Sequence, residues 1–224
     1  MKLTGRLFVL CKELESCTTF ADVGCDHGYC TLYMLENGLC RTAQISDISE
    51  KSLKKAETLL SAYIAEGRVR PVVCDGLAGI DSQTEQVLIA GMGGEEIVKI
   101  LSDGFLPPKL LLQPMKNAEK VRVFLLRHGY ALLRDHTFYA DKKFYDVIKA
   151  ERGGVQEEYS EDMLMFGRGN ILFPSADFAK MLERDIERCR GWIESAKEGR
   201  AEICARLQKL EGLYDETCRR LRGH

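Results

Sequence analysis

The stretch ADVGCDHGYCTLYML, residues 21–35, decides the fold. It begins inside a short apolar run that is typical of a β-strand, and it leads into residues 31–37, which carry the apolar spacing of a helix. A strand that passes through a glycine-containing turn into a helix is the first unit of many nucleotide-binding α/β folds. In this turn, however, Asp26 and His27 stand where a phosphate-binding turn has glycine.

Strands and helices alternate along the first 150 residues. Apolar runs predict the strands, and apolar residues at helical spacing predict the helices between them. The expected strands are residues 20–24, 42–45, 69–74, 86–90, 110–113, 130–134 and 144–149, and the expected helices are residues 3–14, 31–37, 50–63, 96–101 and 118–128. This alternation predicts an α/β fold with a doubly wound parallel sheet, whose last two strands can run antiparallel.

Composition changes after residue 152. Apolar residues recur at helical spacing over residues 178–193 and again over residues 203–221, with Gly199 near the break between the two stripes. We therefore expect a C-terminal α-helical, coiled-coil-like hairpin docked beside the sheet domain. The predicted domains are residues 1–152 and residues 153–224.

Composition argues against several classes of protein. A chain of 224 residues with a formal charge of -2 has no bulk attraction for nucleic acid, so any contact with RNA must use a local basic face. No apolar run approaches the roughly 18 residues of a membrane span, and we expect a cytoplasmic protein without a membrane partner. The nine cysteines include no CxxC pair, which argues against a metal site or disulfides. No obligate protein partner is evident, and a monomer is expected.

A ligand of an open parallel sheet binds at the carboxyl ends of its strands. In this sequence those ends carry residues 24–28, Asp47, Asp75 with Gly76, and residues 91–94. Asp47 lies 23 residues after Gly24, and a carboxylate at that distance suits the two hydroxyls of a ribose. The dinucleotide fingerprint GxGxxG is absent, because Asp26 stands at its second glycine and would repel a pyrophosphate. The pattern therefore favours an adenosine-type ligand.

Several motifs carry a resemblance to a known family, and in chain order they are DVGCDHGY, CDGLAGI, IAGMGG, LLLQP and KKFYDVI. Together they resemble the bacterial tRNA (adenine-22-N1)-methyltransferases, which belong to the S-adenosylmethionine-dependent class I methyltransferases. The resemblance covers residues 1–150, and the C-terminal hairpin also matches the layout of the family. It implies a Rossmann-like class I methyltransferase fold, S-adenosyl-L-methionine as cofactor, tRNA as partner, and methylation of N1 of an adenine.

Carried over by position, the resemblance implies a cofactor site that spans four strand ends. Residues 22–28 would hold the methionine part and the neighbouring ribose, Asp47 would bind the ribose, and Asp75 with Gly76 would lie beside the adenine ring. The implied cofactor-binding residues are Asp22, Gly24, Cys25, Asp26, His27, Gly28, Asp47, Ile48, Asp75, Gly76, Ala90 and Gly91.

The residues expected at the reacting base are Asp26, Gly91, Met92 and Gly93. The N1 lone pair of adenine is free at neutral pH, so catalysis is mainly positioning. The charge that develops on the ring favours acceptors aimed at its exocyclic amine, and we expect these to be backbone carbonyls of residues 90–93 and the carboxylate of Asp26. As ordinary alternatives, residues 91–94 could form only a tight turn, and His27 could only begin a helix.

Contacts with RNA are expected near the same edge and on the hairpin, at Gly94, Gln113, Lys116, Lys142, Lys143, Tyr145, Arg184 and Arg188. A charged helical hairpin is also typical of a solvated face. Two positions depart from the family pattern: Met115 stands where the family has Asn, and Arg168 stands where the family has Pro. Two alternative functions remain open, namely methylation of another RNA base or a small molecule, and a catalytically silent nucleoside-binding RNA adapter.

Overall fold

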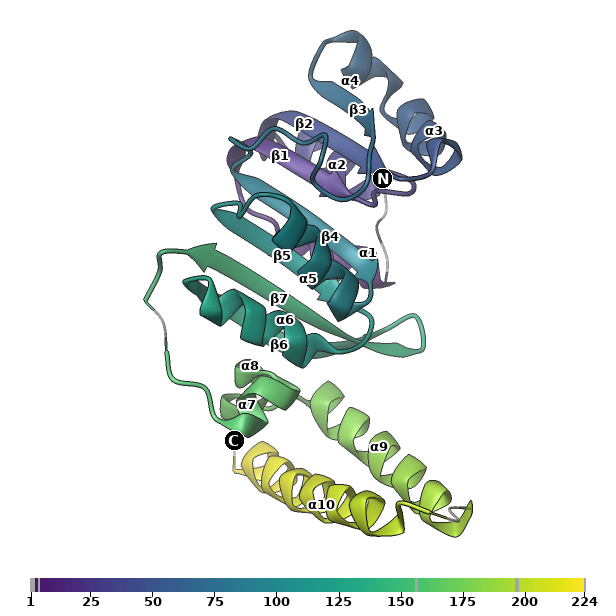
Figure 1. Ribbon diagram of the computed structural model, residues 1–224, viewed down its shortest axis with the longest axis vertical. Coiled ribbons are helices and arrows are strands. Elements are labelled where there is room, and N and C mark those ends of the chain that lie inside the picture. Colours follow the sequence, from purple (N-terminus) through teal and green to yellow (C-terminus); the bar gives the residue numbers. More distant parts are fainter. Residues whose placement is uncertain (1–2, 4, 156, 196–197, 224) are drawn as a thin grey trace.

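The computed structural model describes residues 3, 5–155, 157–195 and 198–223 and contains a seven-stranded sheet (Figure 1). The strands are β1 (Cys17–Val23), β2 (Cys40–Asp47), β3 (Val69–Val73), β4 (Gln86–Met92), β5 (Lys109–Pro114), β6 (Tyr130–Ala140) and β7 (Lys143–Arg152). Their order in the sheet is β3-β2-β1-β4-β5-β7-β6. The first five run parallel, while β7 pairs antiparallel with both β5 and β6. The predicted α/β sheet is therefore confirmed, and its last two strands are antiparallel.

Helices cover both faces of the sheet. Successive residues of a strand point to opposite faces, so each buried strand contributes apolar side chains to two cores. Phe20 and Leu88 belong to the core that α1, α2 and α3 complete, whereas Ala21 and Ile89 belong to the core under α5 and α6 (Figure 1). The helices of this domain are α1 (Gly5–Glu13), α2 (Tyr29–Glu36), α3 (Glu50–Leu59), α4 (Ser61–Ala65), α5 (Gly94–Asp103) and α6 (Ala118–Arg127).

Several element boundaries differ from the sequence-based ones. The helix expected over residues 50–63 is interrupted at Leu60, whose side chain is fully buried, so the structure has α3 and α4 in its place. β4 continues past residue 90 to Met92, with an irregularity in its pairing with β5. β6 and β7 are longer than expected, because they pair with each other along almost their whole lengths.

The C-terminal part contains the predicted helical hairpin and a connector that the sequence-based boundaries missed. The hairpin helices are α9 (Ala176–Ser195) and α10 (Arg200–Arg222), which lie side by side (Figure 1). Phe178, Leu182 and Leu210 are among the buried residues between them. The connector forms α7 (Glu161–Phe166) and α8 (Arg168–Leu172), and helices of six and five residues are too short to show a periodic pattern.

A buried ion pair joins the connector to the sheet domain. Arg122 of α6 is fully buried, and its Nε donates to the carboxylate of Asp135 at 2.8 Å. Its Nη1 donates to the backbone carbonyls of Leu164 and Met165 in α7. The backbone N–H of Arg168 donates to Asp135 at 3.0 Å, which the proline of the family pattern could not do. Arg168 therefore adds a hydrogen bond to this joint.

Candidate functional site

The carboxyl ends of the five parallel strands lie along one edge of the sheet, and backbone hydrogen bonds connect the loops that follow them. The N–H groups of Gly24 and Cys25 both donate to the carbonyl of Ser46. Further along the edge, the N–H of Cys74 donates to the carbonyl of Asp47 at 3.2 Å. The structure therefore brings the first three expected site loops together through the backbone itself.

The turn after β1 depends on left-handed backbone conformations. Gly24 has φ 70°, Asp26 has φ 46° and Gly28 has φ 72°. A Cβ on Gly24 would lie 2.2 Å from Cε of Met92, and a Cβ on Gly28 would lie 3.0 Å from Cβ of Ala56 in α3. Positive φ favours glycine at both positions, and at Gly28 the packing against α3 also leaves little room for a side chain.

Asp22 lies beneath this turn and is 5% exposed. Its Oδ2 accepts a hydrogen bond from Oγ1 of Thr31 at 3.0 Å. Burial raises the pKa of Asp22 to about 6, because water no longer stabilises the charged form. Burial also raises the pKa of the Cys25 thiol, which keeps it neutral. Asp22 therefore supports the turn from inside.

Asp26 and His27 are at the surface of the turn. The carboxylate of Asp26 pairs with Nζ of Lys55 at 2.9 Å, and His27 Nε2 lies 3.6 Å from the same carboxylate. The His27 ring stacks on Tyr29 with 5.5 Å between ring centroids. Lys55 was not identified from the sequence, because one lysine on the polar face of a helix carries no distinguishing signal.

The loops after β2 and β3 border a cavity of about 410 Å³. Ile48, Asp75 and Gly76 line it together with Ile100 from α5. Ile48 lies at the margin of the cavity and is 72% exposed, so its apolar side chain can cover a flat ligand in the cavity. The carboxylate of Asp47 accepts a hydrogen bond from the N–H of Ser49 at 2.8 Å, and Ser49 is the residue that precedes α3. The structure thus groups these expected cofactor-binding residues.

The glycine-rich segment at the end of β4 forms a bulge. Ala90 pairs with Gln113 and Met92 pairs with Pro114, which leaves Gly91 between two registers with φ 83°. The carbonyl of Met92 accepts the N–H of Met115 at 2.8 Å. Gly91 is exposed, so its backbone is the part of this segment that is open to a ligand.

Arg6 reaches this edge from α1, and sequence reasoning missed it. Its Nη1 donates to Oε1 of Gln113 at 2.8 Å, and its guanidinium lies 5.9 Å from the centroid of the Tyr145 ring. Its backbone N–H donates to Asp141 at 2.9 Å, which fixes the start of α1 on the turn between β6 and β7. A Cβ on Gly91 would lie 3.5 Å from Nη1 of Arg6. A single arginine on an amphipathic helix had offered no signal of this placement.

Three of the expected RNA contacts are buried. Gly94 packs so closely that a Cβ would lie 2.2 Å from the carbonyl oxygen of Asn117. Gln113 has no exposed surface, and Tyr145 is 8% exposed, with its ring 5.6 Å from that of Phe138. The structure corrects the expectation for these three positions, because neighbouring atoms occupy the surface that RNA would need.

The expected lysines are exposed near the same edge. Lys142 and Lys143 lie at the turn between β6 and β7, which extends past the end of β5 because β7 runs in the opposite direction. Lys116 follows β5, and its Cε lies 3.2 Å from the place of a Cβ on Gly93. These three cations therefore lie on elements that end at the edge carrying Gly91.

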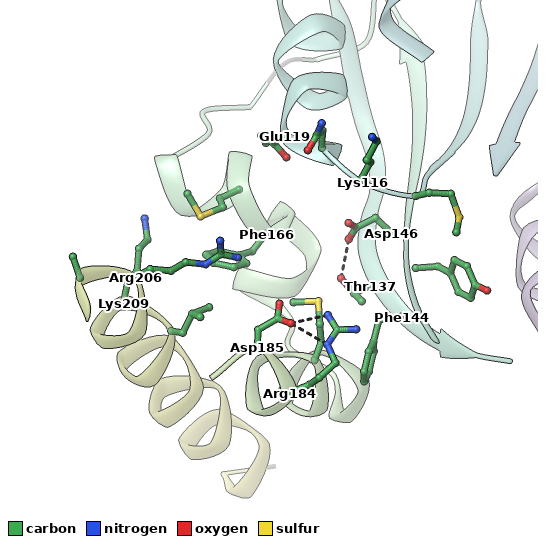
Figure 2. A pocket seen from close by; sticks show the side chains of 17 residues that line it. Lys116, Glu119, Thr137, Phe144, Asp146, Phe166, Arg184, Asp185, Arg206 and Lys209 are labelled. Carbon is green, nitrogen blue, oxygen red and sulfur yellow. Dashed lines mark hydrogen bonds and ion pairs between the residues drawn. The ribbon is translucent and has the colours of Figure 1, made fainter. Parts of the chain in front are cut away.

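The two hairpin arginines expected to contact RNA each lie against an aromatic ring. The guanidinium of Arg184 lies 4.7 Å from the centroid of the Phe144 ring, next to a cleft between the sheet domain and the hairpin (Figure 2). The guanidinium of Arg188 lies 5.4 Å from the centroid of the Trp192 ring. Only Arg184 of the two lines the cleft.

Within the part of the chain that the structure describes, no group of three His, Cys, Asp or Glu side chains is placed to hold a metal ion. All nine cysteines are free thiols. Among the described helices, none combines the length and apolar character needed to cross a membrane.

Comparison with known proteins assigns the sheet domain. A family model described as a methyltransferase domain matches residues 3–148. The chain belongs to this family. The Bacillus subtilis protein named tRNA (adenine(22)-N(1))-methyltransferase is 26% identical over 226 residues, covering 96% of this chain and 94% of its own.

Solved structures share the fold of the methyltransferase domain together with the hairpin. M. capricolum TrmK, in complex with S-adenosyl-homocysteine, has a TM-score of 0.86 at 22% identity and covers 96% of this chain and 99% of its own. A Streptococcus pneumoniae protein in complex with S-adenosyl-L-methionine has a TM-score of 0.83 at 25% identity, covering 93% of this chain and 98% of its own. The predicted Rossmann-like methyltransferase fold is thereby confirmed.

Proposed function

We propose that the protein is an S-adenosylmethionine-dependent methyltransferase that modifies N1 of adenine-22 in tRNA. A methyltransferase domain alone does not specify the acceptor, because one fold serves many substrates. The observation that carries the proposal is the similarity to the Bacillus subtilis enzyme of that name, which spans 96% of the chain and so includes the hairpin. With tRNA as substrate, we expect the reaction to take place in the cytoplasm.

The carboxyl edge of the sheet fits this cofactor. The cavity beside Ile48 and Asp75 is lined by apolar side chains such as Ile100 and by charged ones, which are Asp75, Glu96, Lys99 and Asp103. Its apolar part suits an adenine ring, and a carboxylate can accept a hydrogen bond from the amine of that ring. Asp47 stands between that cavity and the turn at Gly24, where a ribose would lie. The carboxylate of Asp26 suits the positive charge of the methionine part. When bound, the cofactor supplies an activated methyl group on a sulfonium.

The residues of this chain act by positioning the base and by accepting hydrogen bonds from it. Of the carbonyls expected to face the adenine amine, that of Met92 already accepts the N–H of Met115, and that of Gly93 accepts the N–H of Ile97. Gly91, at the bulge, leaves the regular ladder and is exposed. We therefore assign the Gly91 carbonyl, with the carboxylate of Asp26, as the groups that stabilise charge on the methylated ring.

Access to N1 requires an unpaired adenine, because this atom lies on the pairing edge of the base. The surrounding RNA must therefore be held while the base is turned out. Lys116, Lys142 and Lys143 offer positive charge beside the edge that carries Gly91. All of these groups belong to one chain, so we expect the monomer to be active.

The direct test is incubation of the pure protein with S-adenosyl-L-methionine and an unmodified bacterial tRNA transcript, followed by nucleoside mass spectrometry. The proposal expects 1-methyladenosine. A different methylated nucleoside would favour methylation of another base. Binding of both cofactor and tRNA without any product would favour the silent adapter.

A further inference from the structure

A cleft of about 840 Å³ separates the methyltransferase domain from the helical hairpin (Figure 2). One wall begins at Met115 and Lys116, immediately after the carboxyl end of β5. The opposite wall is formed by α9 and α10, through side chains such as Arg184 and Arg206. The cleft therefore lies next to the proposed site of methylation, and Met115 and Lys116 lie between the two.

At the wall next to β7, Phe144 and Arg184 form a pair that we call the platform. Phe144 lines the cleft, and the guanidinium of Arg184 lies 4.7 Å from the centroid of its ring. Nε of Arg184 donates to Oδ1 of Asp185 at 2.9 Å, and Nη2 lies 2.8 Å from the same oxygen, so its plane is held from one side (Figure 2). Bases stack on aromatic rings and on arginine planes, and the Arg184 guanidinium, which lies over the Phe144 ring, offers such a plane at the cleft.

The charges around the platform suit a phosphate-bearing ligand. Three acids line the cleft: Asp185 is bonded to Arg184, Asp146 accepts from Oγ1 of Thr137 at 2.8 Å, and Glu119 is the third. Of the cations, Lys209 pairs with Asp162, whereas no described acid lies within ion-pair distance of Lys116 or Arg206. Lys116 and Arg206 are two positive charges against the one negative charge of Glu119, and this positive balance favours the RNA backbone.

We propose that this cleft binds a nucleotide of the tRNA that lies next to the target adenosine. Its base stacks on the platform of Phe144 and Arg184, and phosphates of the same strand lie beside Lys116 and Arg206. This inference rests on the proposed tRNA substrate, and it adds a nucleotide subsite that holds the RNA while the target base is turned out.

The test uses the full chain and tRNA transcripts with 2-aminopurine on either side of the target adenosine, because stacking quenches the fluorescence of this base. Phe144→Leu removes the ring, Phe144→Tyr keeps it, and Arg184→Gln removes the guanidinium. Arg190→Gln is the matched control: Arg190 lies on the same helix and pairs with Glu211 at 2.7 Å, outside the cleft. Cofactor affinity and thermal unfolding are measured for each variant to confirm folding.

We expect wild type and Phe144→Tyr to quench one of the two probes, and Phe144→Leu to abolish that quenching. Phe144→Leu and Arg184→Gln should each raise KM for tRNA about tenfold, the loss expected for one stacked base, with cofactor affinity unchanged. Arg190→Gln should raise KM by less than about twofold. Formation of 1-methyladenosine with unchanged quenching and KM in Phe144→Leu would overturn the subsite but leave the proposed function intact. Absence of product and of tRNA binding in wild type would overturn both.

Discussion

At the carboxyl edge of the sheet, binding positions are set by the backbone, whereas in the cleft beside the hairpin they are set by long side chains. The edge depends on Gly24, Gly28 and Gly91, all at positive φ, and on hydrogen bonds between loops. The cleft depends on Phe144 and Arg184, which are 40 residues apart and meet through the packing of the hairpin. We infer that the cofactor site is rigid, whereas the proposed RNA subsite forms only when the hairpin is docked correctly on the sheet domain.

The largest effect that separates the two regions is expected at their joint. Arg122→Met removes one partner of a fully buried ion pair and leaves the Asp135 carboxylate without its guanidinium. We expect the free energy of unfolding to fall by about 3–5 kcal/mol, measured by urea denaturation. Among molecules that remain folded, tRNA affinity should weaken more than cofactor affinity, because the hairpin loses its anchor while the edge is untouched.

A double variant is the control for this joint. Arg122→Met with Asp135→Leu removes both charges, and apolar replacement of a whole buried pair is often neutral. It should recover much of the stability lost in the single variant. A fall of less than about 1 kcal/mol in Arg122→Met alone would show that the pair does not hold the two parts together.

A smaller effect is expected beneath the cofactor turn, where Asp22 has a pKa raised to about 6 by burial. In the unfolded chain its pKa is about 4, so the folded protein binds the proton more tightly and this carboxyl makes folding less favourable as pH rises from about 4 to about 6. Asp22→Asn imitates the protonated form and can still accept from Thr31. The variant should therefore match wild type near pH 4 and be more stable at pH 8, by at most about 3 kcal/mol.

Thermal unfolding of Asp22→Asn and wild type at both pH values measures this difference. Equal stability at pH 8 would mean that Asp22 is ionised without penalty in the folded protein.

The smallest of the three effects concerns turnover. Asp26→Asn keeps the left-handed conformation accessible, because Asn tolerates it well, but removes the charge. We expect kcat for tRNA to fall about tenfold, since the carboxylate is exposed and its field is partly screened. Lys55→Gln is the matched variant: it removes the ion-pair partner of Asp26, keeps the carboxylate, and should keep most of the turnover. Full turnover in Asp26→Asn with unchanged cofactor affinity would remove Asp26 from catalysis.

Sequence periodicity predicted every strand of the sheet, because buried strands are short apolar runs with clear glycine or proline ends. Periodicity gave wrong or missing helices where tertiary packing, and not the local apolar pattern, decides the conformation. Leu60 fits the helical stripe, yet the chain turns there to bury it. The connector helices α7 and α8 are held by contacts with Arg122 and Asp135, and such contacts leave no periodic trace.

The site divides in the same way. The strand ends at Asp47, Asp75 and Gly91 could be predicted, because parallel strands must present their carboxyl ends at one edge. Arg6 and Lys55 could not, since each comes from a helix whose docking the sequence does not specify. Burial of Tyr145 was equally hidden, because alternation along a strand does not tell which face is covered.

The central claim, methylation of adenine-22, is tested most directly by primer extension on a tRNA transcript after reaction with the protein and S-adenosyl-L-methionine. A methyl group on N1 blocks base pairing, so reverse transcription should stop next to that adenine, and a transcript with guanine at the same position should give no stop. A stop at a different adenine, or none from a protein that binds the cofactor, would contradict the account.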